Sequence, residues 1–221
     1  IADTTPPAAP TNLSATAVSG TQIDLDLDDN GEADLSGYNV YRDTAAGVPV
    51  DGAHQVATGV ATSDYSDTTV SDDTTYYYVV TAVDNHSNES GASNEASATT
   101  PDETAPAAPT NLSATAVSTS QIDLDWDDNG EADLDGYNVY RDTSSGVAVD
   151  PGNQVATGVA SSDYSDTGLL DNTTFYYVVT AVDTSANESG ASNEASATTQ
   201  DAAPSAPTNL TATAVSTSQI D

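Results

Sequence analysis

Apolar and polar residues alternate with a period of two along most of this chain. In residues 121–127, Ile122, Leu124 and Trp126 alternate with polar residues, and TFYYVVTAVD at residues 174–183 continues the pattern. This period places successive side chains on opposite faces of a β-strand. Runs of Gly, Asp, Asn and Ser separate these segments, as turns do. About seven short strands in roughly 90 residues are typical of a sandwich. We therefore predict an all-β fold of tandem, antiparallel, seven-stranded β-sandwiches.

The chain also repeats itself. PTNLSATAVS begins at Pro10 and again at Pro109, and PTNLTATAVS begins at Pro207. Residues 10–100 align with residues 109–199 without a gap, and 72 of the 91 positions are identical. Segments rich in Pro, Ala and Thr separate the copies, which favours short, stiff linkers. The predicted organisation is an N-terminal extension at 1–9, repeats at 10–100 and 109–199, linkers at 101–108 and 200–206, and the start of a truncated third repeat at 207–221.

Several features of each repeat resemble the fibronectin type III family. PTNL opens the first predicted strand, Trp126 lies on the second, and GYNVYR forms the third. In the segment from SDYSDTGL to TTFYYVVTAVD, Leu169 stands six residues before an aromatic at the position of the tyrosine corner. The resemblance covers both full repeats and the start of the third. It implies an immunoglobulin-like sandwich with fibronectin type III topology in each repeat.

The two repeats depart from the family pattern at different positions. Leu27 stands in the first repeat where the second has Trp126. The corner residue is Tyr76 in the first repeat but Phe175 in the second, which has no hydroxyl to bond the backbone. We expect the second corner to be weaker, unless Tyr176 takes its place, and we expect the repeats to differ in stability.

The charge of the chain excludes some partners. It carries 35 acidic residues against two arginines and no lysine, for a net charge of −33. Nucleic acid needs a basic footprint, and anionic membranes attract basic segments, so neither is expected as a partner. No apolar run approaches the ~18 residues of a membrane span. At molar salt the Debye length of ~3 Å would screen the self-repulsion. The composition therefore resembles that of proteins from extreme halophiles, with an ordinary acidic secreted protein as the alternative.

Candidate catalytic residues are scarce. The chain has no cysteine, so disulfides and thiolate metal sites are excluded. Its two histidines, His54 and His86, are replaced in the second repeat by Asn153 and Ser185, so a repeated catalytic unit could not use them. No nucleophile elbow, phosphate loop or HExxH motif occurs. We predict that the chain is not an enzyme and binds no cofactor.

The stretch DWDDNG at residues 125–130 opens like an EF-hand calcium loop. An EF-hand needs a bidentate Glu at its twelfth position, but the twelfth residue counted from Asp125 is Gly136. Asp125 also flanks the inward-facing Trp126, so it lies on a strand. A calcium joint stays open as a minor alternative to a solvated acidic loop. Its oxygen ligands would come from the loop after the second strand and from the linker: Asp127, Asp128, Asn129, Glu131, Asp133, Asp102 and Glu103.

Two surface features remain open. Asparagine sequons are frequent, and Asn88 and Asn187, in the predicted loop before the last strand, are the leading glycosylation candidates if the protein is secreted. Four tyrosines are expected to face outward on the sheets, where they would support glycan binding or lateral contacts between copies: Tyr41, Tyr77, Tyr140 and Tyr176.

These observations favour a structural role. The chain has no methionine, so we expect it to be a piece of a longer protein. We predict a non-catalytic repeat array that forms an extended extracellular or cell-surface stalk, filament, fibre or adhesin segment of a halophile. Its partners would be neighbouring repeats, other copies in a filament, or a surface protein or glycan. The alternatives are spacer modules of a secreted polysaccharide-degrading enzyme, or a module that binds a glycan or protein.

Overall fold

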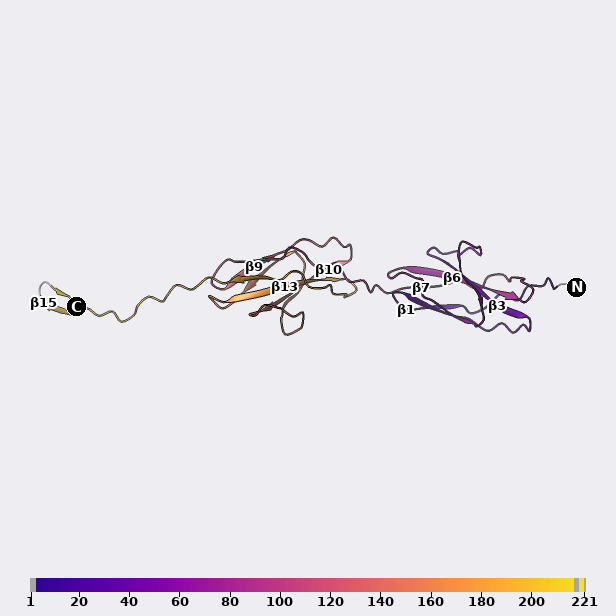
Figure 1. Cartoon of the computed structure of the whole chain (residues 1–221), viewed down its shortest axis with the longest axis horizontal. Helices are drawn as coiled ribbons and strands as arrows, with labels where there is room; N and C mark the ends of the chain where they lie inside the picture. Colours follow the sequence, from indigo (N-terminus) through magenta and orange to yellow (C-terminus); the bar gives the residue numbers. More distant parts are fainter. Residues whose placement is uncertain (1–2, 217–218, 221) are drawn as a thin grey trace. The chain divides into compact units, whose positions relative to one another are not determined.

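The chain folds into two compact units, Ile1–Thr104 and Ala105–Asp221. The computed structural model describes residues 3–216 and 219–220. Residues 1–2 of the predicted N-terminal extension, and 217–218 and 221 of the predicted third repeat, lie outside the described residues. Figure 1 shows each unit as a set of extended strands joined by loops.

The first unit has seven strands in two antiparallel sheets. One sheet has the order β1-β2-β5 and the other the order β4-β3-β6-β7. In the longest pairing, Leu35 of β3 lies opposite Asp84 of β6 and Asp43 opposite Tyr77. The strands are β1 Ser14–Ser19, β2 Gln22–Asp26, β3 Leu35–Asp43, β4 Gln55–Val60, β5 Asp64–Asp67, β6 Thr75–Asp84 and β7 Ala96–Thr99.

The second unit repeats this arrangement with sheets β12-β9-β8 and β11-β10-β13-β14. Its strands are β8 Ser113–Ala116, β9 Gln121–Asp125, β10 Leu134–Asp142, β11 Gln154–Val159, β12 Asp163–Thr167, β13 Thr174–Asp183 and β14 Ala195–Thr198. The prediction of all-β, antiparallel, seven-stranded sandwiches is confirmed. Beyond them, β15 Ala214–Ser216 pairs with β16 Gln219–Ile220. Leu210, just before this pair, is 94% exposed, whereas its counterparts Leu13 and Leu112 are 4% exposed.

The core of each unit lies between its two sheets and uses the alternating residues. Ile122, Leu124 and Trp126 are all at most 3% exposed, as the period of two predicted. The Trp126 ring meets the Tyr137 ring edge-on, with 5.2 Å between centroids. Leu27 fills the corresponding place in the first core, which therefore closes around a smaller side chain.

A close approach of the backbone fixes one glycine in each repeat. A Cβ atom on Gly37 would lie 2.7 Å from the carbonyl oxygen of Val60, and one on Gly136 would lie 2.9 Å from that of Val159. Such contacts are too short for any other residue, so glycine lets β3 and β10 pass close to the neighbouring strand.

The corner of the first unit is closed by a hydroxyl that the second unit lacks. The Ser71 amide donates a hydrogen bond of 3.0 Å to Oη of Tyr76. In the second unit, Phe175 stands in the place of Tyr76 and Leu170 in the place of Ser71. Among the described residues, the Leu170 amide makes no hydrogen bond that replaces the one from Ser71. Both rings lie under an arginine, with Arg42 4.9 Å from the Tyr76 centroid and Arg141 5.4 Å from the Phe175 centroid.

We predict that Phe175→Tyr stabilises the second unit by about 1 kcal/mol, because the new hydroxyl would accept the Leu170 amide as Tyr76 accepts Ser71. Trp126 is the only tryptophan, so its fluorescence reports unfolding of the second unit alone. The urea midpoint from this fluorescence should rise in F175Y. The matched change Tyr76→Phe should leave it unmoved, and an unchanged or lower midpoint in F175Y would contradict the assignment.

Candidate functional site

Both arginines of the chain are used inside the sandwiches. Nη1 of Arg42, on β3, lies 2.7 Å from Oδ2 of Asp67, at the end of β5, and the Asp67 side chain is fully buried. Oη of Tyr78, on β6, donates to the same Oδ2 at 3.0 Å. Because β3 and β6 belong to one sheet and β5 to the other, this cluster joins the two sheets. We assign it a structural role, because it ties the buried carboxylate of one sheet to side chains of the other.

The second unit contains the same cluster with different donors. Nη1 of Arg141 lies 2.9 and 2.8 Å from the two carboxylate oxygens of Asp166, and Oη of Tyr177 donates to Oδ2 at 2.8 Å. Gly168 replaces Thr69, whose amide and hydroxyl both donate to Asp67 in the first unit. The arginine of the second unit therefore bonds both oxygens of its aspartate.

The surroundings of Asp67 favour its charged form. Burial opposes the charge, but hydrogen bonds from Thr69 and Arg42, together with the charge of Arg42, outweigh it and lower the pKa of the carboxyl below its ordinary value. Burial and the neighbouring carboxylate raise the pKa of Tyr78 far above the usual range of tyrosine. Both groups therefore keep one protonation state near neutral pH, which suits a permanent link and not acid–base chemistry.

Tyr41 and Tyr140 do not lie exposed on the sheets, so that expectation was wrong. Each is 3% exposed. In the first unit the loop between β3 and β4 folds over the outer face of the sheet, and Val48 packs with Tyr41 and Val79. The hydroxyl of Tyr41 donates to Oε1 of Glu89 at 2.7 Å. Tyr77 and Tyr176 are half-buried. The predicted aromatic surface for glycans or lateral contacts is therefore much reduced.

The buried hydroxyl of Tyr41 belongs to a second polar cluster, which is centred on the carboxylate of Glu89. Oε1 of Glu89 also accepts hydrogen bonds from Nδ2 of Asn39 and from the Thr81 hydroxyl. Burial opposes its charge, but the bonds from Thr81, Tyr41 and Asn39 outweigh burial and lower the pKa of Glu89. The second unit repeats the cluster around Glu188. These bonds tie the loop before the last strand to the middle of the sheet.

In the second unit, the loop that resembles an EF-hand binds the chain that precedes the first strand. Oδ2 of Asp127 accepts bonds from the side chains of Thr110, at 3.0 Å, and Asn111, at 2.6 Å. Nδ2 of Asn129 donates to the Ala107 carbonyl at 2.7 Å, and Oε1 of Glu131 accepts the Ala107 amide at 2.8 Å. The bond from Ala107 is the main reason that the pKa of Glu131 is lowered. Asp127 and Glu131 of this loop thus hold the segment that precedes the first strand, Asp127 through side chains and Glu131 through a backbone amide.

Some oxygen atoms of these loops stay unpaired. The loop and the preceding segment line an open surface pocket of about 180 Å³ in the second unit and of about 210 Å³ in the first. Oδ1 of Asn129 and Oε2 of Glu32 are buried there without a hydrogen-bond partner among the described residues. Asp128 is exposed in the same loop, and the backbone carbonyl of Asp133 accepts the Thr184 amide at 2.9 Å.

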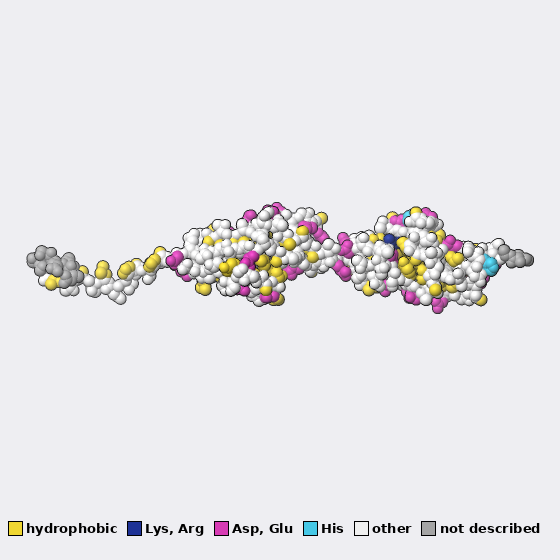
Figure 2. Space-filling model, in the orientation of Figure 1, with side chains coloured by type: hydrophobic (Ala, Val, Ile, Leu, Met, Phe, Trp, Pro, Cys, Tyr) yellow, Lys and Arg dark blue, Asp and Glu magenta, His cyan; other side chains and the backbone are white. Residues whose placement is uncertain are grey.

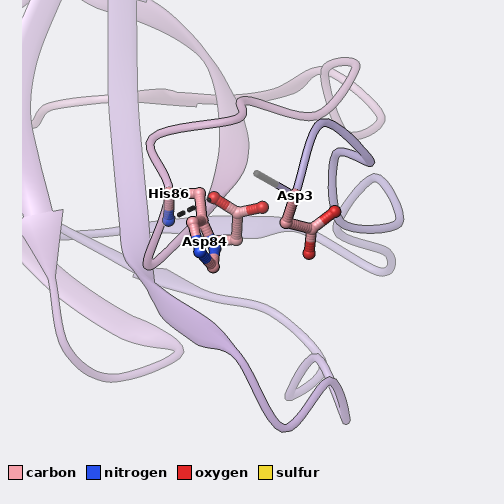
Figure 3. A group of neighbouring side chains, drawn as sticks. All are labelled: Asp3, Asp84 and His86. Atoms are coloured by element: carbon pink, nitrogen blue, oxygen red, sulfur yellow. Dashed lines mark hydrogen bonds between the residues drawn. The ribbon is translucent and has the colours of Figure 1, made fainter. Parts of the chain in front are cut away.

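The linker acids Asp102 and Glu103 belong to the first unit, whereas the loop acids belong to the second. A calcium joint made from both sets therefore stays a prediction. Within the first unit, the sequence patterns missed another group of possible metal ligands, formed by Asp3, Asp84 and His86, whose ligand atoms all lie within 4.8 Å of one another (Figure 3). The sequence patterns do not reveal this group, because Asp3 lies far along the chain from Asp84 and His86.

Hydrogen bonds already occupy much of this group. Oδ1 of Asp84 accepts the backbone amides of His86, at 2.8 Å, and Asn88, at 2.9 Å, so it closes the turn after β6. Nδ2 of Asn88 donates to Oδ2 of Asp84 and to the Asp3 carbonyl. The carboxylate of Asp84 therefore has a structural role without any ion.

The glycosylation candidates take part in this same turn. Both hydrogens of the Asn88 side-chain amide are used in the two bonds described above, and a glycan on this nitrogen would leave it only one. Nδ2 of Asn187 donates to Oδ2 of Asp183 at 2.9 Å in the second unit. Glycosylation at either site stays a prediction, and at Asn88 it would remove one of these two hydrogen bonds.

No catalytic arrangement is seen in the part of the chain that the structure describes. The His54 ring lies between the carboxylates of Asp43 and Asp51, and His86 lies beside Asp84 in an exposed turn. On the face drawn in Figure 2, acidic side chains are scattered over both units and are not gathered around a cleft. Among residues 3–216 and 219–220, no helix has the length and hydropathy to cross a membrane.

Comparison with known proteins finds a family model that matches part of this chain. Residues 107–198 match the family model of the fibronectin type III domain. The chain is 36% identical over 209 residues to exoglucanase B of Cellulomonas fimi, and the match covers 90% of this chain and 17% of exoglucanase B. It is 31% identical over 206 residues to chitinase A1 of Niallia circulans, covering 89% of this chain and 26% of the chitinase.

One solved structure, of an Fn3-like protein from Clostridium thermocellum, is 36% identical, covers 47% of this chain and 100% of that chain, and has a TM-score of 0.37. The chain thus spans about a quarter or less of the length of the enzymes it resembles.

For the calcium joint, we predict that millimolar Ca²⁺ raises the thermal midpoint of the full chain, since an ion that binds only the folded state stabilises it. The combined change Asp128→Asn and Glu103→Gln should abolish the shift. Mg²⁺ at the same concentration controls for screening of the surface charge. A midpoint that Ca²⁺ does not move, or that both ions move equally, would remove the calcium joint.

Proposed function

Because residues 107–198 match the family model of the fibronectin type III domain, and residues 10–100 are identical to residues 109–199 at 72 of 91 positions, we propose that the chain is a pair of non-catalytic spacer modules of a secreted polysaccharide-degrading enzyme. The observation that carries the proposal is the match of about nine-tenths of the chain to part of exoglucanase B and part of chitinase A1. The modules would set the distance between the other parts of such an enzyme at the surface of an insoluble polymer.

The structure of each unit supports a spacer. Each sandwich has its own core and its own buried ion pair, so its internal links do not depend on the other unit. The linker is held at both ends. The Thr104 hydroxyl donates to Asp72 in the first unit, and Ala107 is bound by Glu131 in the second. Only Ala105 and Pro106 lie between these anchors, and proline restricts that step further.

The same comparisons support a secreted setting, and we propose an extracellular location for this chain. The high-salt setting inferred from the 35 acidic residues stays a prediction. Circular dichroism in dilute buffer tests it, because a chain that depends on screening should lose its β-sheet signal there.

A structural array remains the second candidate. The observation in its favour is the near-identity of the two repeats, since copies that differ at 19 of 91 positions suit a role in which length is made by repetition. An array would carry further repeats in place of a catalytic domain. The domain content of the full-length protein separates the two candidates.

We test the spacer role by deleting residues 10–199 from the full-length protein. Hydrolysis of a small soluble substrate should be unchanged, because the modules do not touch the reacting bond, whereas hydrolysis of the insoluble polymer should fall several-fold. The matched control replaces the first repeat with a second copy of residues 109–199, which keeps the spacing and should keep the activity. Unchanged activity on the insoluble polymer after deletion would contradict the proposal.

A further inference from the structure

The loop between β3 and β4 is held at three places in each unit. At its start, Oδ1 of Asp43 accepts the Ala45 amide at 3.2 Å. In its middle, Oε2 of Glu95 accepts the amides of Gly47, at 2.7 Å, and Val48, at 3.0 Å. Near its end, Oδ1 of Asp51 caps the turn before β4. The second unit has the same three holds, made by Asp142, Glu194 and Asp150.

His54 adds a link that only the first unit has. Its Nδ1 lies 2.7 Å from Oδ1 of Asp51, and its Nε2 lies 3.2 Å from Oδ2 of Asp43. The ring therefore bridges the two ends of the loop. Asn153 takes its place in the second unit and bonds only backbone and Asp150, with Nδ2 donating to the Ala148 carbonyl.

The bridge needs a charged imidazole. A neutral ring has one N–H and one bare nitrogen, and a carboxylate offers only acceptors. With a carboxylate oxygen at each nitrogen, both nitrogens can donate only when the ring is protonated. In the neutral ring, one lone pair would face an anionic oxygen.

The loop covers an apolar patch. Val48 packs on Tyr41 and Val79 and is 9% exposed, whereas its counterpart Val147 is only half-buried. Opening of the loop would therefore uncover Tyr41 and Val79 on the outer face of the sheet.

We infer that the β3–β4 loop of the first unit is a pH-sensitive flap, which protonated His54 fastens over the patch of Tyr41, Val48 and Val79 and which loosens when the ring loses its proton. The β10–β11 loop of the second unit has no such fastening. The two otherwise similar modules thus differ in how they respond to pH.

The direction of the pH dependence follows from the contacts. The bond to Asp51 is the main cause that raises the pKa of His54 above its ordinary value of 6.5, and the charge of Asp43 adds to it. Because the pKa of His54 is raised in the folded protein, the protonated ring stabilises the closed loop fully below pH 6.5. This stabilisation is lost as the pH rises through the pKa that His54 has in the folded protein. The other charged groups near the loop do not reverse this. Glu95 is anionic, and the guanidinium of Arg42 is bonded to Asp67.

Hydrogen exchange on the full chain tests the flap. The second unit is an internal reference, because Gly146 and Val147 make the same bonds to a glutamate as Gly47 and Val48. Across a series from pH 5 to pH 9, protection of Gly47 and Val48 relative to Gly146 and Val147 should fall as pH rises. In His54→Asn, which copies the second unit, this ratio should be independent of pH.

The imidazole signals of His54 give a second readout. His54 should titrate at a higher pH in the unaltered chain than in Asp51→Asn, and D51N should also shift the loss of relative protection to lower pH. A protection ratio that does not change with pH, or that changes equally in H54N, would overturn the flap. So would an unaltered titration of His54 in D51N. None of these results bears on the spacer role.

Discussion

In each sandwich, an ion pair between a partly exposed arginine and a buried aspartate links the two sheets. Arg42 reaches from β3 to Asp67 on β5, and Tyr78 completes the cluster from β6. The chain has two arginines and no lysine against 35 acidic residues, and each unit uses its one arginine in this place. A buried pair is costly to break because removing one partner leaves an uncompensated charge. The hydrophobic core supplies most of the stabilisation, and the pair adds a polar link between the sheets.

Around this constant frame, the two units differ at a small number of positions with local effects. Trp126 enlarges the second core, and Tyr76 closes the first corner with a hydrogen bond that Phe175 cannot make. His54 fastens a loop in the first unit that Asn153 leaves without this link. None of these changes builds a cleft with catalytic groups. A frame shared by the two units, with differences confined to corners and loops, is consistent with the spacer role proposed above.

The fold followed from the sequence because a period of two directly reports which residues face a sheet core. Ile122, Leu124 and Trp126 lie where the alternation placed them. Features that depend on contacts between distant segments did not follow. The partner of Arg42 lies 25 residues away on the other sheet, although a lone arginine at the same strand position of both repeats was an available signal. The burial of Tyr41 was missed because a loop covers the outer face of its sheet, and alternation within one strand does not show this.

The link between the sheets is tested most directly by the effect of Asp166→Asn on the urea unfolding of the full chain, followed by Trp126 fluorescence. The buried pair predicts a loss of roughly 3 kcal/mol in the free energy of unfolding of the second unit, because Arg141 would lose its anionic partner. The matched change Asp67→Asn should leave this transition in place, since it affects only the first unit. A change below about 0.5 kcal/mol in D166N, typical of an ordinary surface position, or an equal shift in D67N, would contradict the account.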